Sequence, residues 1–272
     1  MIKVGGAVVE DAASLGNLIM QFAEMPGRKV LVHGGGRSAT RMATRLGIES
    51  HMVGGRRITD DEMLSVVTMV YGGLVNKNIV AGLQAKDVNA IGLCGADMNI
   101  IRAHRRPLKR MTMDDGSEQM VDFGWVGDVD SVDGHALLSL LERGAVPVVA
   151  PLTHDGDGHL LNTNADTMAS QTAQGLAAAC NSVGNPSSDA DEVCLTYCFE
   201  KPGVLRDADD DNSVIPLITP CIYEQLKADG IVSGGMLPKL DNAFDALRRG
   251  VSRVVITQAS DIKGLHGTTI TL

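Results

Sequence analysis

The stretch Lys29-Val30-Leu31-Val32-His33-Gly34-Gly35-Gly36 decides the class of fold. Its first five residues read as a buried strand, which stops at the three glycines. Residues 38–46 then read as a helix that ends at Gly47, a common C-terminal stop. A strand, a glycine loop and a helix in direct succession are typical of an α/β protein.

The same alternation runs along the whole chain. Residues 2–4 form a β-prone run before Gly5-Gly6, and residues 11–25 show helical spacing up to Pro26-Gly27. Thr59 is expected to cap a helix that weakens at Gly72-Gly73. Residues 100–105 and 125–132 resemble a hairpin-rich insertion. Further strands are predicted at 89–94, 146–150, 192–199 and 253–257, and further helices at 134–143, 165–179, 219–228 and 238–249. We therefore predict a mostly parallel sheet covered by helices, with lobes at 1–161 and 162–272.

Composition narrows the class of protein. The chain has 272 residues, of which 44% are hydrophobic and 21% charged, enough for a sizeable core. The net charge of −9 argues against nucleic-acid binding. Five cysteines without metal-type spacing suggest free thiols in a reducing compartment. We see no signal peptide and no run of about 20 apolar residues, so we expect a cytoplasmic protein without a membrane partner.

Two glycine-rich strand ends are candidate phosphate sites. Lys3 precedes Gly5-Gly6, and lysine resists burial unless it is paired. The alternative is a surface lysine before a tight turn. Gly34-Gly35-Gly36 would expose amides at a helix start, where anions bind, or could form a structural turn. Residues 34–39 also match a loose dinucleotide fingerprint, G-x-G-x-x-A.

Two polar clusters could bind a carboxylate or position a charge. Arg57, after Arg56, could grip a carboxylate with its two-pronged guanidinium, or the pair could be solvated. Asn164 could cap a helix that Asp166 stabilises, which leaves Asn162 for a ligand.

The segment Gly234-Gly235-Met236-Leu237-Pro238-Lys239 gives the strongest argument from physics alone. Lys239 falls in the first turn of a predicted helix, where a cation is disfavoured by the helix dipole. A bound anion would resolve that conflict. The basic run 102–110, in contrast, reads as a solvated hairpin face, and no histidine spacing predicts a metal site.

Together these motifs resemble the amino acid kinase family. Each motif alone is modest, but the eight of them follow the order of the family and cover almost the whole chain. The motifs are K-V-G-G at 3–6, V-H-G-G-G at 32–36, R-I-T at 57–59, N-K at 76–77, V-G-D-V at 126–129, P-V-V-A at 147–150, N-T-N-A-D at 162–166 and G-M-L-P-K at 235–239.

The resemblance implies a three-layer αβα sandwich with a central, mostly parallel sheet. The N-terminal lobe would bind the acyl amino acid and dimerise, and the C-terminal lobe would bind ATP. The implied reaction is phosphoryl transfer from ATP with Mg²⁺ to the side-chain carboxylate of N-acetyl-L-glutamate, the second step of arginine synthesis. The resemblance further implies a homodimer insensitive to arginine.

Residue roles follow from the same resemblance. Lys3 and Lys239 match the lysines that stabilise the transferred phosphoryl group, and Asp166 matches the carboxylate that orients them. Gly5 and Gly6 match amide donors to the phosphates. The matched substrate-binding residues are Gly35, Gly36, Arg57 and Asn162. The matched nucleotide-binding residues are Glu200, Lys201, Pro202, Gly203, Val204, Leu205, Ile231, Val232 and Ser233. The chain departs from the family pattern at residues 200–203 and at Ser233-Gly234, where an aspartate is usual.

Several alternatives stay open. The same reaction could use another N-acyl-glutamate, such as N-succinyl-L-glutamate. Carbamate kinase and aspartokinase activities fit the middle motifs less well. From other classes, a non-catalytic ligand sensor on the same fold would not need Lys3, Asp166 and Lys239, and a dinucleotide-dependent oxidoreductase rests on residues 34–39 alone.

Overall fold

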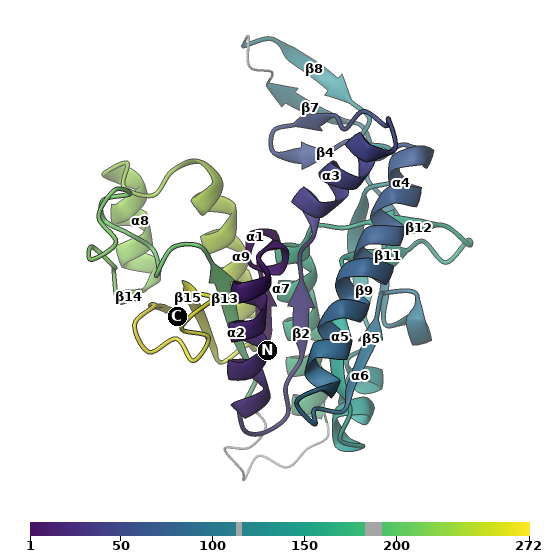
Figure 1. Ribbon diagram of the computed structural model, residues 1–272. Helices are drawn as coiled ribbons and strands as arrows, with labels where there is room; N and C mark the ends of the chain where they lie inside the picture. The colour runs from purple at the N-terminus through teal and green to yellow at the C-terminus, as the bar shows by residue number, and fades with distance from the viewer. Residues whose placement is uncertain (113–115, 183–191) are drawn as a thin grey trace.

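A computed structural model describes residues 1–112, 116–182 and 192–272. Eight strands form a central sheet in the order β14-β16-β15-β13-β1-β2-β10-β5 (Figure 1). Every neighbouring pair is parallel except β15 and β16. The strands are β1 (Ile2–Val4), β2 (Leu31–His33), β5 (Ala90–Leu93), β10 (Val146–Val149), β13 (Cys194–Phe199), β14 (Leu217–Ile218), β15 (Arg253–Gln258) and β16 (Thr268–Ile270).

Helices cover both faces of this sheet and confirm the predicted αβα sandwich (Figure 1). One face packs on α1 (Gly6–Glu10), α2 (Ala12–Glu24), α3 (Gly36–Arg45), α4 (Asp61–Val67), the π-helix η1 (Thr68–Val75) and α5 (Asn76–Gln84). The other face packs on α6 (Gly134–Glu142), α7 (Ala165–Ser182), α8 (Pro220–Ala228) and α9 (Leu237–Arg248). Short 3₁₀ turns lie at η2 (Asp97–Asn99) and η4 (Gly234–Met236).

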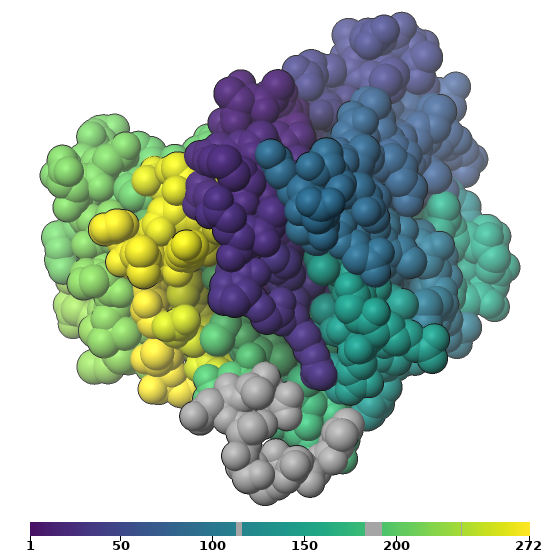
Figure 2. Space-filling model, turned by 60° about the horizontal axis from the view of Figure 1, so that its bottom comes forward, coloured from purple at the N-terminus to yellow at the C-terminus, as the bar shows by residue number. Residues whose placement is uncertain are grey.

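Alternation along the strands divides the core into two. Ile2, Val4 and Leu31 point to the α2 and α5 side, whereas Val32 and Tyr197 point to the α7 and α9 side. Because successive side chains in a strand face opposite ways, both faces of a central strand must be apolar. Figure 2 shows the surface of the N-terminal part of the chain between later parts, and β1 itself lies between β13 and β2 in the sheet.

The predicted hairpin-rich insertion is confirmed as a second, four-stranded sheet with two ribbons beside it. Its order is β12-β11-β6-β9, and β6 pairs antiparallel with β9. The strands are β6 (Ile101–Arg105), β9 (Gly127–Val132), β11 (Leu152–His154) and β12 (Leu160–Asn162). The ribbons pair β3 (Met52–Val53) with β4 (Arg56–Arg57) and β7 (Lys109–Thr112) with β8 (Glu118–Val121).

The helix expected after Thr59 differs from the prediction at its start, where the capping residue is Asp60. Asp60, not Thr59, caps α4, because its carboxylate accepts a hydrogen bond from the Met63 amide at 2.8 Å. Thr59 is fully buried, and its hydroxyl accepts a hydrogen bond from Asn162 Nδ2 at 2.9 Å. The predicted weak point at Gly72-Gly73 lies inside the π-helix that joins α4 to α5.

The same helix bears on our expectation that the chain has no apolar segment long enough to span a membrane. Over Asp61–Gln84 it is long and apolar enough to cross a membrane, judged by length and composition alone. Core helices pass the same test, and here Met63, Val67 and Ile79 are buried against the sheet. Length and composition therefore give weak support for a membrane span.

Candidate active site

The candidate site lies where β13, β1 and β2 end side by side. β2 follows β1 on one side, and β13, from much later in the chain, pairs with β1 on the other. The order of the strands in the sheet therefore reverses at β1. In open parallel sheets, such a reversal leaves a crevice beyond the carboxyl ends of the strands. Lys3 therefore lies at a position where ligands commonly bind.

Two glycine loops meet backbone to backbone above these strands. A Cβ atom on Gly34 would lie 3.0 Å from the Gly6 nitrogen, and one on Gly35 would lie 2.8 Å from Tyr71 Cδ1. The Gly34 amide donates to the Val4 carbonyl at 3.0 Å and fixes the two loops together. A side chain at Gly34 would press against the Gly5-Gly6 loop, and one at Gly35 would press against the Tyr71 ring, so close approach explains both glycines.

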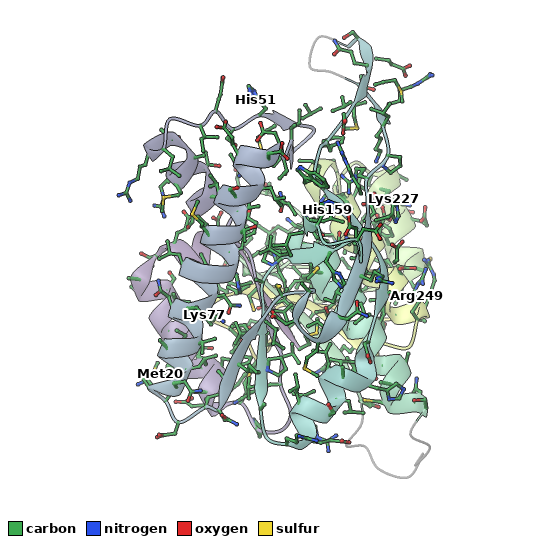
Figure 3. The ribbon with its side chains drawn as sticks, turned by 90° about the vertical axis from the view of Figure 1, so that its right-hand side faces the viewer. Met20, His51, Lys77, His159, Lys227 and Arg249 are labelled. Atoms are coloured by element: carbon green, nitrogen blue, oxygen red, sulfur yellow. The ribbon has the colours of Figure 1, made fainter. Side chains whose placement is uncertain are left out.

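His33 supports the loop from below as a neutral side chain. Its ring nitrogens lie 2.9 Å from the Gly34 carbonyl and 3.1 Å from Asn76 Nδ2. Burial lowers the pKa of His33 to about 4. A neutral, buried imidazole supplies no charge to a ligand, so His33 has a structural role. Lys77, next to Asn76, is exposed on α5 (Figure 3).

Lys3 is buried and paired with Asp166. Its Nζ lies 2.5 Å from Asp166 Oδ1, and the two side chains are 6% and 19% exposed. Asp166 stands in the first turn of α7, where Asn164 Oδ1 accepts hydrogen bonds from the Asp166 and Thr167 amides. Asn164 therefore caps this helix start. A buried lysine with one carboxylate partner is held in one place at the strand end.

Two adjoining cavities share this ion pair as a common wall. A cavity of about 230 Å³ lies over the glycine loop, and one of about 440 Å³ lies toward α9. Lys3, Gly6, Gly36 and Asp166 line both. A group carried from one cavity to the other would therefore pass the Lys3 ammonium.

Lys239 lines the larger cavity together with Lys3. Both Nζ atoms contact the ring of Phe199, at 4.6 Å from its centroid for Lys3 and 4.2 Å for Lys239. Gly5 and Gly6 line the same cavity. The structure thus brings the two predicted catalytic lysines, their carboxylate and the predicted phosphate-binding glycines into one cleft.

The four predicted substrate residues, Gly35, Gly36, Arg57 and Asn162, all line the smaller cavity. Arg57 is 9% exposed and donates through Nη2 to the Gly36 carbonyl at 2.8 Å and to Thr40 Oγ1 at 2.9 Å. It also contacts Ser50. These bonds fix the guanidinium, so a ligand carboxylate would meet a preorganised charge.

The predicted nucleotide residues separate into two groups. Glu200, Lys201 and Gly203 line the larger cavity. The remaining six do not line it: Pro202, Val204, Leu205, Ile231, Val232 and Ser233. Val204 and Val232 are 1% and 3% exposed and belong to the hydrophobic core, so their side chains face away from the cavity. Nucleotide binding by all nine residues stays a prediction.

Sequence reasoning missed two arginines of the smaller cavity. The basic run was interpreted as a solvated face, which is wrong for Arg106, whose side chain is 16% exposed and lines the cavity. Arg106 Nη2 donates to Asp128 Oδ1 at 2.6 Å. Arg56 lines the same cavity, and its pKa is lowered by burial and by Arg106. Only the pairing of β6 with β9 brings Arg106 here, and no local pattern signals it.

Over residues 1–112, 116–182 and 192–272, no three His, Cys, Asp or Glu side chains are grouped as metal ligands. A divalent cation in the described part of the site would meet separate carboxylates such as Asp166, and it would also meet the phosphates of a nucleotide if one were bound. Mg²⁺ commonly binds proteins in that way, through phosphates, water and one or two carboxylates.

Two cavities that meet at a paired lysine, with a second lysine in one of them, are the arrangement of a phosphotransferase. The model of the amino acid kinase family matches residues 1–184, and the chain belongs to that family. Among its relatives, the acetylglutamate kinase of Bacteroides thetaiotaomicron is 58% identical over 270 residues, which cover 99% of this chain and 97% of that protein.

Two solved structures share the fold at lower identity. The crystal structure of smu.665 from Streptococcus mutans UA159 has a TM-score of 0.76 and 24% identity, covering 99% of this chain and 97% of that one. N-acetylglutamate synthase from Neisseria gonorrhoeae, complexed with coenzyme A and N-acetyl-glutamate, has a TM-score of 0.75 and 22% identity, covering 100% of this chain and 58% of that one. The glycine loop at 34–39 is thus explained by the amino acid kinase fold without a dinucleotide.

Proposed function

We propose that this chain transfers the terminal phosphoryl group of ATP to the side-chain carboxylate of N-acetyl-L-glutamate, the second step of arginine biosynthesis. The observation that carries the proposal is the pair of cavities that meet at Lys3 and Asp166, with Lys239 in the larger one. The smaller cavity suits the acyl amino acid, because Arg57 and Asn162 line it. The larger cavity suits ATP, which is the larger of the two substrates.

In this reaction a carboxylate oxygen of the acceptor attacks the terminal phosphorus of ATP. A new O–P bond forms between the acceptor oxygen and this phosphorus. The bond from the phosphorus to the bridging oxygen of ATP breaks, and ADP leaves with the electron pair of the broken bond. The acceptor is already ionised at neutral pH, so no general base is needed. Lys3 and Lys239 would offset the negative charge on the migrating group, and Asp166 would hold Lys3 in place.

Further parts of the proposal rest on family membership and composition. We expect Mg²⁺ to bind with the phosphates of ATP and to neutralise part of their charge. We assign acyl amino acid binding mainly to residues 1–161 and ATP binding mainly to 162–272. From composition we also propose a cytoplasmic location. We further propose a homodimer, because the apolar side chains of Met69 and Leu74 on η1 are 54% and 49% exposed.

A coupled ADP-release assay tests the proposed function. Purified protein with ATP, Mg²⁺ and N-acetyl-L-glutamate should release ADP, and hydroxylamine should trap the acyl phosphate product. Carbamate and aspartate serve as matched acceptors that should give no signal. Release of ADP with either of them, and none with any N-acyl-glutamate, would replace this proposal by another activity of the family.

A second acceptor, N-succinyl-L-glutamate, is favoured by Arg56. One carboxylate of an acyl-glutamate would pair with Arg57, and its side-chain carboxylate is the reacting group, which leaves Arg56 at the cavity wall. Arg106 already pairs with Asp128, whereas the Arg56 guanidinium makes no hydrogen bond or ion pair with any described residue. A half-buried guanidinium beside another arginine is stabilised by an added anion, and the terminal carboxylate of a succinyl group would supply one.

Replacing Arg56 by leucine should distinguish the two acceptors. We expect kcat/KM for N-succinyl-L-glutamate to fall roughly 10- to 100-fold, as for the loss of a charged hydrogen bond. The value for N-acetyl-L-glutamate should stay within about threefold. Arg102→Leu is the control, because Arg102 is an exposed arginine of β6 outside this cavity lining. Equal losses for both substrates would remove Arg56 as a specificity residue.

Replacing Arg57 by lysine should mainly raise the KM for the acyl-glutamate. Lysine keeps the charge but loses the fixed, two-pronged donor geometry that Gly36 and Thr40 orient. We expect roughly a tenfold rise in KM, with kcat within about threefold, in steady-state assays at saturating ATP. An unchanged KM would take Arg57 out of the substrate site.

A further inference from the structure

Phe199 is the last residue of β13, and its ring contacts both cleft lysines. Lys3 Nζ lies 4.6 Å from the ring centroid, and Lys239 Nζ lies 4.2 Å from it. Within the described ranges, each of the other cation–aromatic contacts joins one cation to one ring. The motifs at 200–205 and 235–239 do not include this residue.

The Phe199 ring is fixed to the same elements that carry the charged groups. It stacks on Tyr197 with the centroids 6.0 Å apart and the planes 8° from parallel. Tyr197 is 1% exposed, donates its hydroxyl to the Asp166 carbonyl at 3.2 Å, and pairs in register with Lys3 across β1 and β13. The ring is therefore rigidly placed relative to the Lys3–Asp166 pair.

Lys239 depends on this ring more than Lys3 does. The Lys3 ammonium pairs with the carboxylate of Asp166. The Lys239 ammonium has no ion pair or hydrogen bond to any residue that the structure describes. Its position in the first turn of α9 is also unfavourable for a cation. The face of an aromatic ring carries partial negative charge and attracts an ammonium without a formal charge. Such a contact can be exchanged for a phosphate oxygen when a nucleotide binds.

We propose that Phe199 is a positioning residue for phosphoryl transfer, which holds the ammonium groups of Lys3 and Lys239 at one point of the cleft before ATP binds. The inference rests on the proposed kinase function. A carboxylate between the lysines would bind them tightly and repel the phosphates. A neutral ring holds the two like charges near each other and adds no negative charge that would compete with the migrating group.

The proposal predicts separate effects on turnover and on substrate binding. Phe199→Leu keeps an apolar side chain but removes the aromatic face, and should lower kcat roughly tenfold. The KM for the acyl-glutamate should stay within about twofold, because the smaller cavity does not include Phe199. Phe199→Tyr retains the aromatic face and should keep kcat within about twofold of the parent.

NMR of lysine Cε groups gives a readout that does not depend on activity. In the parent protein the ring current of Phe199 should shift the ε-CH₂ protons of Lys3 and Lys239 upfield, and Phe199→Leu should abolish both shifts. Lys77 is the reference, because its ammonium donates to Asn76 Oδ1 and the Gly92 carbonyl and contacts no aromatic ring among the residues that the structure describes. Unshifted signals in the parent protein would overturn the proposal, and so would a parental kcat in folded Phe199→Leu or an equal loss in Phe199→Tyr. Upfield shifts in a protein that phosphorylates no acyl-glutamate would instead reject the kinase function and leave the lysine positioning intact.

Discussion

Replacing Lys3 or Lys239 by alanine should slow turnover roughly 10²- to 10³-fold, which is typical for the loss of one preorganised charge at a transition state. The two ammonium groups share one cleft and one aromatic ring, so each would act on the same migrating phosphoryl group. Negative charge in that region is redistributed during transfer, and the lysines stabilise it most in the transition state.

The KM for the acyl-glutamate should change by less than about threefold in both variants, since Arg57 and Asn162 carry ground-state binding. Steady-state ADP release at saturating ATP measures both constants. Lys227→Ala is a matched control, because Lys227 also contacts an aromatic ring, 4.5 Å from the Tyr223 centroid, but lies on α8 outside both cavities (Figure 3). Parental turnover in both cleft variants would reject the mechanism.

Replacing Asp166 by asparagine should reduce both stability and turnover. The change keeps the shape of the side chain but leaves the Lys3 ammonium, 6% exposed, without a charged partner. Breaking a buried pair on one side costs about 3–5 kcal/mol, and the partial exposure of Asp166 places our expectation near 2–3 kcal/mol. Turnover should fall roughly 100-fold, because Lys3 loses the group that orients it.

A double variant separates the two effects of the Asp166 change. Lys3→Met with Asp166→Asn removes the unpaired charge and should recover most of the unfolding free energy, while turnover stays low. Denaturant titration and ADP release measure the two quantities. Asp211→Asn breaks the exposed Lys201–Asp211 pair and should cost at most about 1 kcal/mol. If Asp166→Asn were as mild as Asp211→Asn, the ion pair would not support the site.

The local patterns that predicted the candidate site are those in which a charged side chain falls where the local structure disfavours a charge. Lys3 in a buried strand and Lys239 in a helix start are both unfavourable alone, and both face the same cleft. Nucleotide binding at residues 200–205 stays a prediction, and within this segment the Val204 side chain packs in the core. A side chain's direction there depends on β13 and β16, which local sequence does not specify.

The sequence by itself determined the alternation of strands and helices, the glycine loops and the identity of the charged groups. These features depend on residues close together in the chain, where backbone preferences and apolar spacing operate. The tertiary structure alone decided that β13 lies beside β1, that Phe199 contacts two lysines, and that Arg56 and Arg106 share a cavity. Those relations join segments far apart in the chain, and they are set by burial of the whole sheet between its helices.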